Sequence, residues 1–279
     1  MTLDLHGGRL GILAGGGDLP KEIIEYCQSH SIECYAVYFK GQSDDDRLDS
    51  VDHDVVRLGQ TQKTLNLLKK HDCTHIVFAG SIRRPSLFDL KPDLRTAKFF
   101  TKLGMGAAGD DRLLRAVRAE LEKEGFLVLG AHDILPDILT PEGLLTDVSP
   151  DTRDWEDIKS AYHILEKTGE LDIGQGCIVQ HGLVLGIEAI EGTDALIERC
   201  GYHKRSGGGG SLVKRLKPGQ DMLMDIPTVG ELTVEKLKNA GLKGMALEAG
   251  KSQILNLSET ISAANAAGLF IVGFTADEL

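Results

Sequence analysis

The sequence lacks the features that would fix it in a membrane or export it. No uninterrupted apolar run reaches the ~20 residues that a membrane-spanning helix needs. Residues 1–6 lack the basic and apolar regions of a signal peptide. We therefore expect a soluble, cytoplasmic protein whose contact with a membrane, if any, is peripheral.

The cysteines lack the spacing of a redox or zinc motif. Five cysteines occur, an odd number, and no two form a C-x-x-C pair. This pattern is typical of reduced thiols in a cytosol rather than of a disulfide framework or a zinc site.

Positive charge is scarce, because 31 Lys and Arg residues face 42 Asp and Glu residues, for a net charge of −11. A general affinity for nucleic acid or for an anionic membrane surface is therefore not expected. Local basic spots occur at residues 83–84, 204–205 and 214–215.

Several catalytic signatures are also missing. No G-x-S-x-G elbow occurs, which argues against a serine hydrolase. No G-x-x-x-x-G-K-[ST] sequence occurs, which argues against a P-loop NTPase, and no H-E-x-x-H pattern occurs. A covalent nucleophile or a zinc-bound histidine pair is therefore not indicated.

Strand-like and helix-like segments do alternate through the first half of the chain. Short apolar runs predict strands, at residues 10–14, 34–39, 75–79 and 126–129. Between them lie helical stripes, including residues 61–70 and 110–124. This alternation favours an α/β fold with a parallel sheet and helices on both faces. We assign residues 1–134 to this N-terminal domain.

The second half follows a different pattern. Prolines and glycines gather in residues 135–150, which we interpret as the interdomain linker. Residues 177–190 predict a β-hairpin with a tight turn at His181-Gly182. With further helices and strands, residues 151–279 predict a mixed α/β C-terminal domain.

A glycine run follows the first predicted strand. Gly15, Gly16 and Gly17 precede a helix, an arrangement that presents backbone N–H groups to a phosphate. Pro20 replaces the third glycine of the dinucleotide fingerprint, and residues 38–40 lack its ribose-binding acid, so NAD is disfavoured. A phosphate or nucleotide site of another kind remains, and the alternative is a tight turn needed for packing.

The segment of residues 224–230 carries an aspartate, Asp225, two positions before a proline. Thr228 and Glu231 have the spacing of a capping box, which predicts a helix from about Val229 to Gly241. Asp225 would then lie near the positive end of that helix and stay ionised. An ionised carboxylate on a loop can ligate Mg²⁺ or accept a proton from water.

Two further loops bring acidic residues to helix starts, one with Asp110 and Asp111 and one with Thr193 and Asp194. Mg²⁺ prefers oxygen ligands and is commonly held by one or two carboxylates and substrate phosphates. The bound metal offsets the charge that develops on phosphoryl oxygens. The alternative is that these residues only cap their helices. This capping explanation is weaker for Asp225, because Thr228 is the predicted cap there.

Two other polar clusters are candidate ligand contacts. Gly80 and Arg84 follow the third strand of the sheet, and ligands of open parallel sheets bind beyond the carboxyl ends of strands. Arg84 could hold a phosphate there, or be a solvated side chain at a turn. Asp172 and Gln175 lie beside glycines and could contact a nucleoside, or form a strand-entry turn.

Six short motifs in order resemble the LpxI-type UDP-2,3-diacylglucosamine pyrophosphatases of lipid A biosynthesis. They lie at residues 11–20, 78–85, 109–111, 171–176, 191–195 and 225–230. The resemblance covers essentially the whole chain. It implies a Rossmann-like, nucleotide-binding N-terminal domain and a distinct catalytic C-terminal domain, with the substrate between them.

The resemblance also implies an activity. The enzyme would be a Mg²⁺-dependent hydrolase of Gram-negative bacteria, a homodimer that splits UDP-2,3-diacylglucosamine into UMP and 2,3-diacylglucosamine 1-phosphate (lipid X). The critical aspartate of the family corresponds to Asp225. The glycine-rich loop at residues 206–211 is longer or more repetitive than the family pattern suggests.

We expect water to attack phosphorus directly, with Asp225 ligating Mg²⁺ or positioning the water. Asp194 and Asp111 are second-choice catalytic residues. The candidates for substrate binding are Gly15, Gly16, Gly17, Gly80, Arg84, Asp110, Gln175, Thr193 and Thr228.

Two other functions remain open from the sequence. One is a different nucleotide-sugar-modifying enzyme, such as a transferase or oxidoreductase, which would need a co-substrate. The other is a non-catalytic sensor of nucleotide-linked lipids, which would bind its ligand without releasing UMP.

Overall fold

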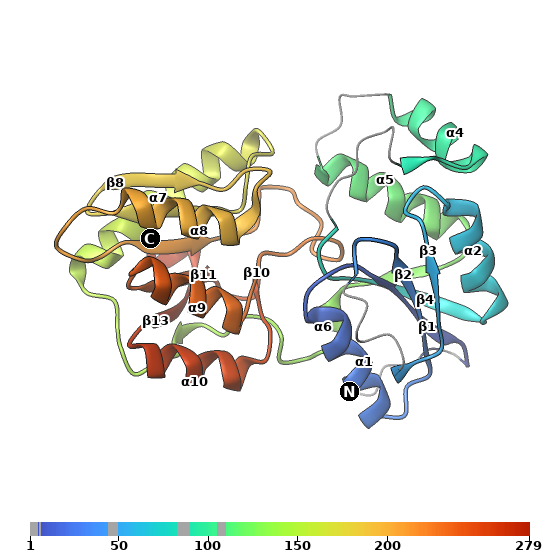
Figure 1. The fold of residues 1–279 in the computed structure, drawn as a ribbon, viewed down its shortest axis with the longest axis horizontal. Coiled ribbons are helices and arrows are strands. Elements are labelled where there is room, and N and C mark those ends of the chain that lie inside the picture. The colour runs from blue at the N-terminus through green and yellow to red at the C-terminus, as the bar shows by residue number, and fades with distance from the viewer. Residues whose placement is uncertain (1–4, 6, 44–49, 83–89, 105–109) are drawn as a thin grey trace. The chain divides into compact units, whose positions relative to one another are not determined.

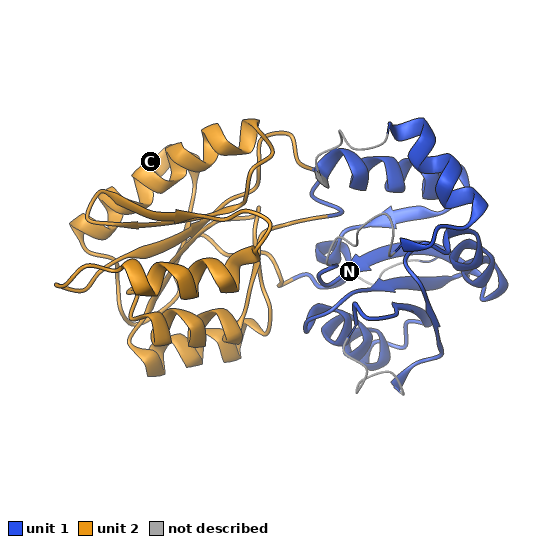
Figure 2. Ribbon diagram, turned by 45° about the horizontal axis from the view of Figure 1, so that its top comes forward, with its two compact units in different colours: residues 1–136, 221–224 blue, residues 137–220, 225–279 orange. Residues whose placement is uncertain are grey.

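The computed structural model of the chain describes residues 5, 7–43, 50–82, 90–104 and 110–279. The chain divides into two compact units, shown in different colours in Figure 2. The first contains residues 1–136 and 221–224, and the second contains residues 137–220 and 225–279. The second unit is therefore interrupted by four residues, 221–224, that belong to the first.

The expected linker at residues 135–150 belongs to the second unit from residue 137 onward. Within it, β6 (Gly143–Leu144) pairs antiparallel with β13 (Phe270–Phe274). The N–H of Ile271 also donates to the Thr146 hydroxyl, at 2.9 Å. The linker expectation thus needs correction over most of its length, because prolines and glycines also border a short edge strand.

The first unit is built on a five-stranded sheet in the order β3-β2-β1-β4-β5, and every pair in it is parallel. The strands are β1 (Arg9–Ala14), β2 (Cys34–Phe39), β3 (His53–Val56), β4 (Cys73–Ala79) and β5 (Leu127–Leu129). The helices are α1 (Leu19–Ser29), α2 (Thr61–Lys70), α4 (Leu94–Leu103), α5 (Asp110–Lys123) and α6 (Ala131–Ile134). The predicted parallel sheet is confirmed, and Figure 1 shows α1 and α6 across the sheet from α5.

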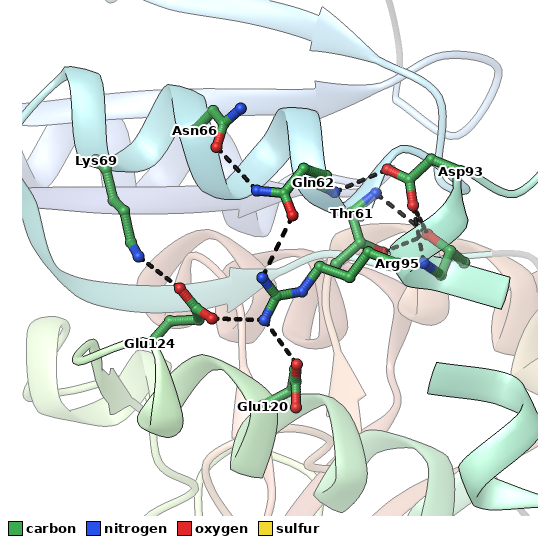
Figure 3. Close-up of polar contacts among 9 residues, drawn as sticks. Thr61, Gln62, Asn66, Lys69, Asp93, Arg95, Glu120 and Glu124 are labelled. Carbon is green, nitrogen blue, oxygen red and sulfur yellow. Dashed lines mark hydrogen bonds and ion pairs between the residues drawn. The ribbon is translucent and has the colours of Figure 1, made fainter. Parts of the chain in front are cut away.

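A polar network joins α2, α4 and α5 on the outside of this unit (Figure 3). Arg95 of α4 donates to Glu120 of α5 at 2.7 Å and to Glu124, directly after α5, at 2.5 Å. Lys69 of α2 also donates to Glu124. Asp93 caps α4, since its carboxylate accepts the N–H of Thr96 at 2.8 Å. The network links the three helices through charged and polar side chains, beside the apolar core that α2 and α5 share.

The second unit has a six-stranded sheet in the order β6-β13-β11-β9-β7-β8. β9 (Ser211–Lys214), β11 (Gly244–Glu248) and β13 run parallel, whereas β7 (Gly176–Gln180) runs antiparallel to β9 and to β8 (Leu183–Ile187). A second, two-stranded sheet pairs β10 (Thr228–Val229) with β12 (Gln253–Ile254). The mixed α/β architecture expected for this half is confirmed.

Helices cover the larger sheet on two faces. α8 (Gly192–His203), α9 (Glu231–Ala240) and α10 (Leu257–Ala267) share one apolar core with it. α7 (Thr152–Glu170) contributes to a separate apolar core, which includes Phe270 and Phe274. A short 3₁₀ turn, Ala276–Glu278, follows β13. Among the described residues, no helix has both the length and the apolar character that crossing a membrane requires.

The predicted hairpin at β7 and β8 is confirmed, and so is its turn. His181 and Gly182 both have positive φ, 50° and 75°, as a two-residue hairpin turn requires. The buried carboxylate of Asp157 on α7 accepts the N–H groups of both residues, at 2.8 and 2.7 Å. α7 therefore holds the turn in place.

The five cysteines are free and buried. Burial raises the pKa of the Cys73 and Cys177 thiols to about 12 each. These two thiols stay neutral near pH 7 and pack as apolar groups.

Candidate active site

Five strands of the second unit present their ends at one edge of the six-stranded sheet. The parallel strands β9, β11 and β13 reach it with their carboxyl ends, and Glu248 lies opposite Phe274 there. The antiparallel β7 begins at the same edge, with Gly176 opposite Lys214, and β8 ends there. Ligands of α/β sheets bind at the carboxyl ends of parallel strands, so this edge is the first place to look for a site.

Buried polar side chains gather at or beside this edge. They are Glu188, Lys214, Arg215, Lys217, Gln220, Glu248, Ser252 and Gln253. Burying so many polar and charged groups is unfavourable unless each finds a partner, and apolar residues would fill the same space more stably. The concentration therefore indicates a functional site rather than a plain core.

Asp225 lies on the loop that returns to this edge, and two glutamine amides hold its carboxylate. Gln220 Nε2 donates to Asp225 Oδ2 at 2.7 Å, and Gln175 Nε2 approaches the same oxygen at 3.4 Å. Gln220 Oε1 in turn accepts from Gln175 Nε2 at 2.8 Å and from the N–H of Lys217 at 3.1 Å. Asp225 is half-buried and the side chain of Gln220 is buried, so the carboxylate has a defined orientation.

The predicted capping box beside Asp225 is wrong. Thr228 belongs to β10, where its hydroxyl donates to the carbonyl of Ile226 at 2.9 Å. α9 begins only at Glu231, with Gly230 as its N-cap, whereas the predicted end at Gly241 is confirmed by its left-handed φ of 65°. A strand thus separates Asp225 from α9. Because the helix field falls off within the first turn, the amides of Gln220 and Gln175 are the relevant contacts.

With Asp225 as the predicted catalytic carboxylate, replacing Gln220 by alanine is expected to lower kcat about 10- to 100-fold, the usual effect of losing a group that orients a catalytic side chain. The affinity for UMP, the product that the motif resemblance implies, should change less than about threefold, since Gln220 acts through Asp225. Steady-state kinetics and calorimetric titration with UMP measure the two effects. Gln62→Ala, which removes a surface amide of the first unit, is the control. An unchanged kcat in Gln220→Ala would show that Asp225 needs no such support.

A second chain of contacts runs through Thr193 and Lys214. Lys214 Nζ donates to Thr193 Oγ1 at 2.7 Å and makes a longer contact, 3.4 Å, with the Thr228 carbonyl. The Thr193 hydroxyl donates to Glu188 Oε1 at 2.6 Å. Thr193 therefore does not use its hydroxyl to cap α8, and it contacts the loop of Asp225 through Lys214.

Arg215, the residue after β9, is buried against a carboxylate and an aromatic ring. Its Nε lies 3.7 Å from Glu248 Oε2, and its guanidinium carbon lies 4.1 Å from the centroid of the Tyr162 ring. Glu248 also accepts from Lys251 Nζ at 2.9 Å and from the N–H of Leu216 at 3.2 Å. Glu248 is thus the main counter-charge at this edge.

Asp194 is exposed in the first turn of α8. Nearby Lys236 ion-pairs with Glu198, whose hydrogen bond is the main cause of the raised pKa of Lys236, and the charge of Asp194 adds to the effect. Within the described ranges, no hydrogen bond or ion pair joins Asp194 to Asp225. The structure brings Gln175, Thr193 and Thr228 into contact networks beside Asp225, but not Asp194.

The glycine turn of the first unit uses its N–H groups internally. Gly15 N–H donates to the Ala79 carbonyl and Gly16 N–H to the Ser81 carbonyl, both at 2.8 Å, and Ser81 N–H donates back to Gly16 at 2.9 Å. A Cβ on Gly80 would lie 2.3 Å from the Gly16 carbonyl oxygen. A phosphate at this turn would therefore need donors other than Gly15 and Gly16. The packing explanation accounts for both of these residues.

Substituting Gly15 by alanine is expected to destabilise the first unit by about 3 kcal/mol, from overpacking and weakened backbone hydrogen bonds. The added Cβ would lie 2.3 Å from the Ser81 carbonyl oxygen. At Gly17, alanine meets nothing within 4 Å but must adopt a φ of 88°, so about 1 kcal/mol is expected there. Hydrogen exchange of the β1 amides gives both values. Equal losses at the two positions would contradict the packing explanation.

Three predicted residues remain: Asp111, Asp110 and Arg84. Asp111 forms an ion pair with Arg115 one turn along α5, and its carboxylate is mostly buried. Asp110 is described only as the first residue of α5. Arg84 lies outside the described residues.

Gln220 and Lys214 were missed as site residues by sequence reasoning. No motif marks Gln220. In the sequence, Lys214 and Arg215 stand out only as a local basic spot, yet both are buried. The available signal was their position at the carboxyl end of an apolar strand, where ligands of α/β sheets bind.

Comparison with known proteins gives two family matches. Residues 9–138 match the model of the LpxI N-terminal domain, and residues 141–272 match that of the LpxI C-terminal domain. A protein of Caulobacter vibrioides named UDP-2,3-diacylglucosamine pyrophosphatase LpxI is 38% identical over 277 residues. That alignment covers 97% of this chain and 99% of the relative.

Proposed function

The chain belongs to the LpxI family, and from this premise we propose that it hydrolyses the diphosphate bond of UDP-2,3-diacylglucosamine. The products would be UMP and 2,3-diacylglucosamine 1-phosphate. The observation that carries the proposal is the Asp225 carboxylate, held by Gln220 at an edge rich in buried polar groups. No covalent nucleophile is required, because water supplies the oxygen that replaces the broken P–O bond.

We propose Mg²⁺ as the metal of this reaction, with Asp225 as its protein ligand. Among the described residues, no three His, Cys, Asp or Glu side chains form a group that could hold a metal. The site therefore fits an ion that arrives with the substrate, because Mg²⁺ is often bound by one carboxylate, waters and substrate phosphates. When bound, the ion would offset negative charge on the phosphoryl oxygens.

The residues of the chain have separable roles in this proposal. Gln220 orients the Asp225 carboxylate through Oδ2. Gln175, directly before β7, links that carboxylate to the end of β9, because its backbone carbonyl accepts the N–H of Arg215, at 3.1 Å. Asp225 would position the attacking water or accept its proton as the P–O bond breaks. Water labelled with ¹⁸O would show which phosphorus is attacked, since the label ends in UMP or in the sugar phosphate.

The substrate class has consequences for partners. Two acyl chains on the sugar imply transient contact with the inner membrane, and we propose that the protein acts there as a homodimer. The first unit, with its parallel sheet, is the proposed nucleotide-binding part. A net charge of −11 disfavours nucleic acid as a partner.

The test is incubation of the purified protein with UDP-2,3-diacylglucosamine and Mg²⁺, without a co-substrate. Release of UMP and the lipid phosphate in equal amounts is expected. A requirement for a second substrate would favour another nucleotide-sugar-modifying enzyme. Binding without UMP release at every Mg²⁺ concentration would favour a sensor.

A further inference from the structure

Lys214 differs from the other buried cations at the sheet edge in its partners. Lys217 forms an ion pair with Asp172 at 2.6 Å, and Arg215 lies 3.7 Å from Glu248. Lys214, only 4% exposed, has no carboxylate within ion-pair distance among the residues that the structure describes. An ammonium taken out of water without a direct counter-charge is unfavourable, so its retention calls for a reason.

The nearest negative charge acts on Lys214 through a hydroxyl. The Thr193 hydroxyl donates its hydrogen bond to Glu188 Oε1, so its oxygen accepts the hydrogen bond from Lys214 Nζ. The other oxygen of Glu188, Oε2, is buried without a hydrogen-bond partner among the described residues. Glu188 thus orients Thr193, and Thr193 orients the ammonium, without neutralising it by direct contact.

The ammonium retains capacity for another acceptor. A lysine has three N–H donors, and here one donates to Thr193 while another makes only the 3.4 Å contact with the Thr228 carbonyl. An anion is the acceptor that would compensate the charge as well as take a hydrogen bond.

The position of Lys214 connects it to Asp225. Lys214 lies opposite Gly176 in the β7–β9 register, next to Gln175, whose amide contacts Asp225. Thr228, its second contact, lies three residues after Asp225, at the start of β10. A Cβ at position 176 would lie 2.8 Å from Glu188 Oε2, so a larger residue there would displace this carboxylate oxygen.

We propose that Lys214 is an anion-binding residue that donates from Nζ to a phosphate oxygen of a diphosphate, with Thr193 and Glu188 as its positioning residues. The anion site rests on the contacts of Lys214. Only the identity of the anion, a nucleoside diphosphate, rests on the proposed function.

The test is calorimetric titration of the full chain with UDP and with inorganic pyrophosphate, in the presence of Mg²⁺. Lys214→Met should weaken the binding of both by at least about 10-fold, the effect of losing one charge-assisted hydrogen bond. Lys214→Arg should recover part of the affinity. Lys243→Met is the matched control, because Lys243 pairs with Asp151 and Asp154 at the opposite edge of the sheet.

A second variant separates binding from stability. Lys214→Met leaves Glu188 without the ammonium, so the double variant with Glu188→Gln should regain thermal stability yet still bind UDP weakly. If the double variant binds UDP and pyrophosphate like the wild type, Lys214 is purely structural and the proposal is overturned. It is also overturned if the wild type binds neither probe.

Hydrolysis is read separately from binding. UDP binding that depends on Lys214, in a protein that releases no UMP from the lipid substrate, would sustain this inference while the proposed function fails. Normal hydrolysis and normal UDP affinity in Lys214→Met would overturn this inference and leave the proposed function intact.

Discussion

Asp225→Ala should lower kcat by about 10³-fold, equivalent to about 4 kcal/mol of lost transition-state stabilisation. The carboxylate is held through Oδ2 by Gln220, so its loss removes a preorganised charge. Asp225→Asn should be nearly as inactive, because it keeps the shape of the side chain but not its charge. Rapid-quench measurement of UMP release under single-turnover conditions gives the chemical step.

Binding should survive both substitutions. The dissociation constant for the lipid substrate should stay within about threefold of wild type when Asp225 acts mainly on the transition state. Asp147→Ala, an exposed aspartate of the same unit, is the control and should retain full turnover. Wild-type turnover in Asp225→Asn would remove the residue from the mechanism.

Glu248→Ala should destabilise the second unit by about 3–5 kcal/mol, the usual loss when one partner of a buried charged pair is removed. Glu248 is 2% exposed. Its carboxylate lies within ion-pair distance of Arg215 and accepts hydrogen bonds from Lys251 and from the N–H of Leu216. The alanine would leave the buried guanidinium of Arg215 without its counter-charge. Trp155, the single tryptophan of the chain, lies on α7 and packs against the core of this unit, so its fluorescence in urea reports the transition.

The companion variants test the cause. Combining Glu248→Ala with Arg215→Met should recover a substantial part of the lost stability, because the unpaired charge is gone. Glu170→Ala, which removes an exposed partner of Lys167, should change stability by less than about 0.5 kcal/mol. A loss below about 1 kcal/mol in Glu248→Ala would mean that water reaches Arg215.

Local sequence signals predicted the elements that local chemistry determines. Apolar runs and glycine positions were enough for the parallel sheet, for the hairpin turn at His181-Gly182 and for the end of α9 at Gly241. The hairpin turn and the helix end depend on residues close in sequence, and the sheet was predicted from strand and helix segments that each have a local pattern.

The errors came from partners distant in sequence. The spacing of Thr228 and Glu231 fits a capping box, but Thr228 pairs with β12 instead. The N–H of Gln253 also donates to the Pro227 carbonyl at 2.8 Å. The glycine turn fits a phosphate loop, yet the carbonyls of Ala79 and Ser81 accept the N–H groups of Gly15 and Gly16. Tertiary hydrogen bonds of this kind leave no local pattern.

The candidate site divides in the same way. The motif resemblance pointed to Asp225, Thr193 and Gln175, which the structure places in contact networks at one sheet edge. Gln220 and Lys214 could not be chosen from spacing, because their roles depend on the antiparallel pairing of β7 with β9 and on the returning loop.

The most direct measurement is a crystal structure of the wild-type protein with Mn²⁺ and a non-hydrolysable analogue of UDP-2,3-diacylglucosamine. We predict anomalous density for Mn²⁺ within about 2.3 Å of an Asp225 carboxylate oxygen and of a diphosphate oxygen. Mn²⁺ bound to other residues, with Asp225 turned to solvent and away from the diphosphate, would contradict the assignment of this carboxylate.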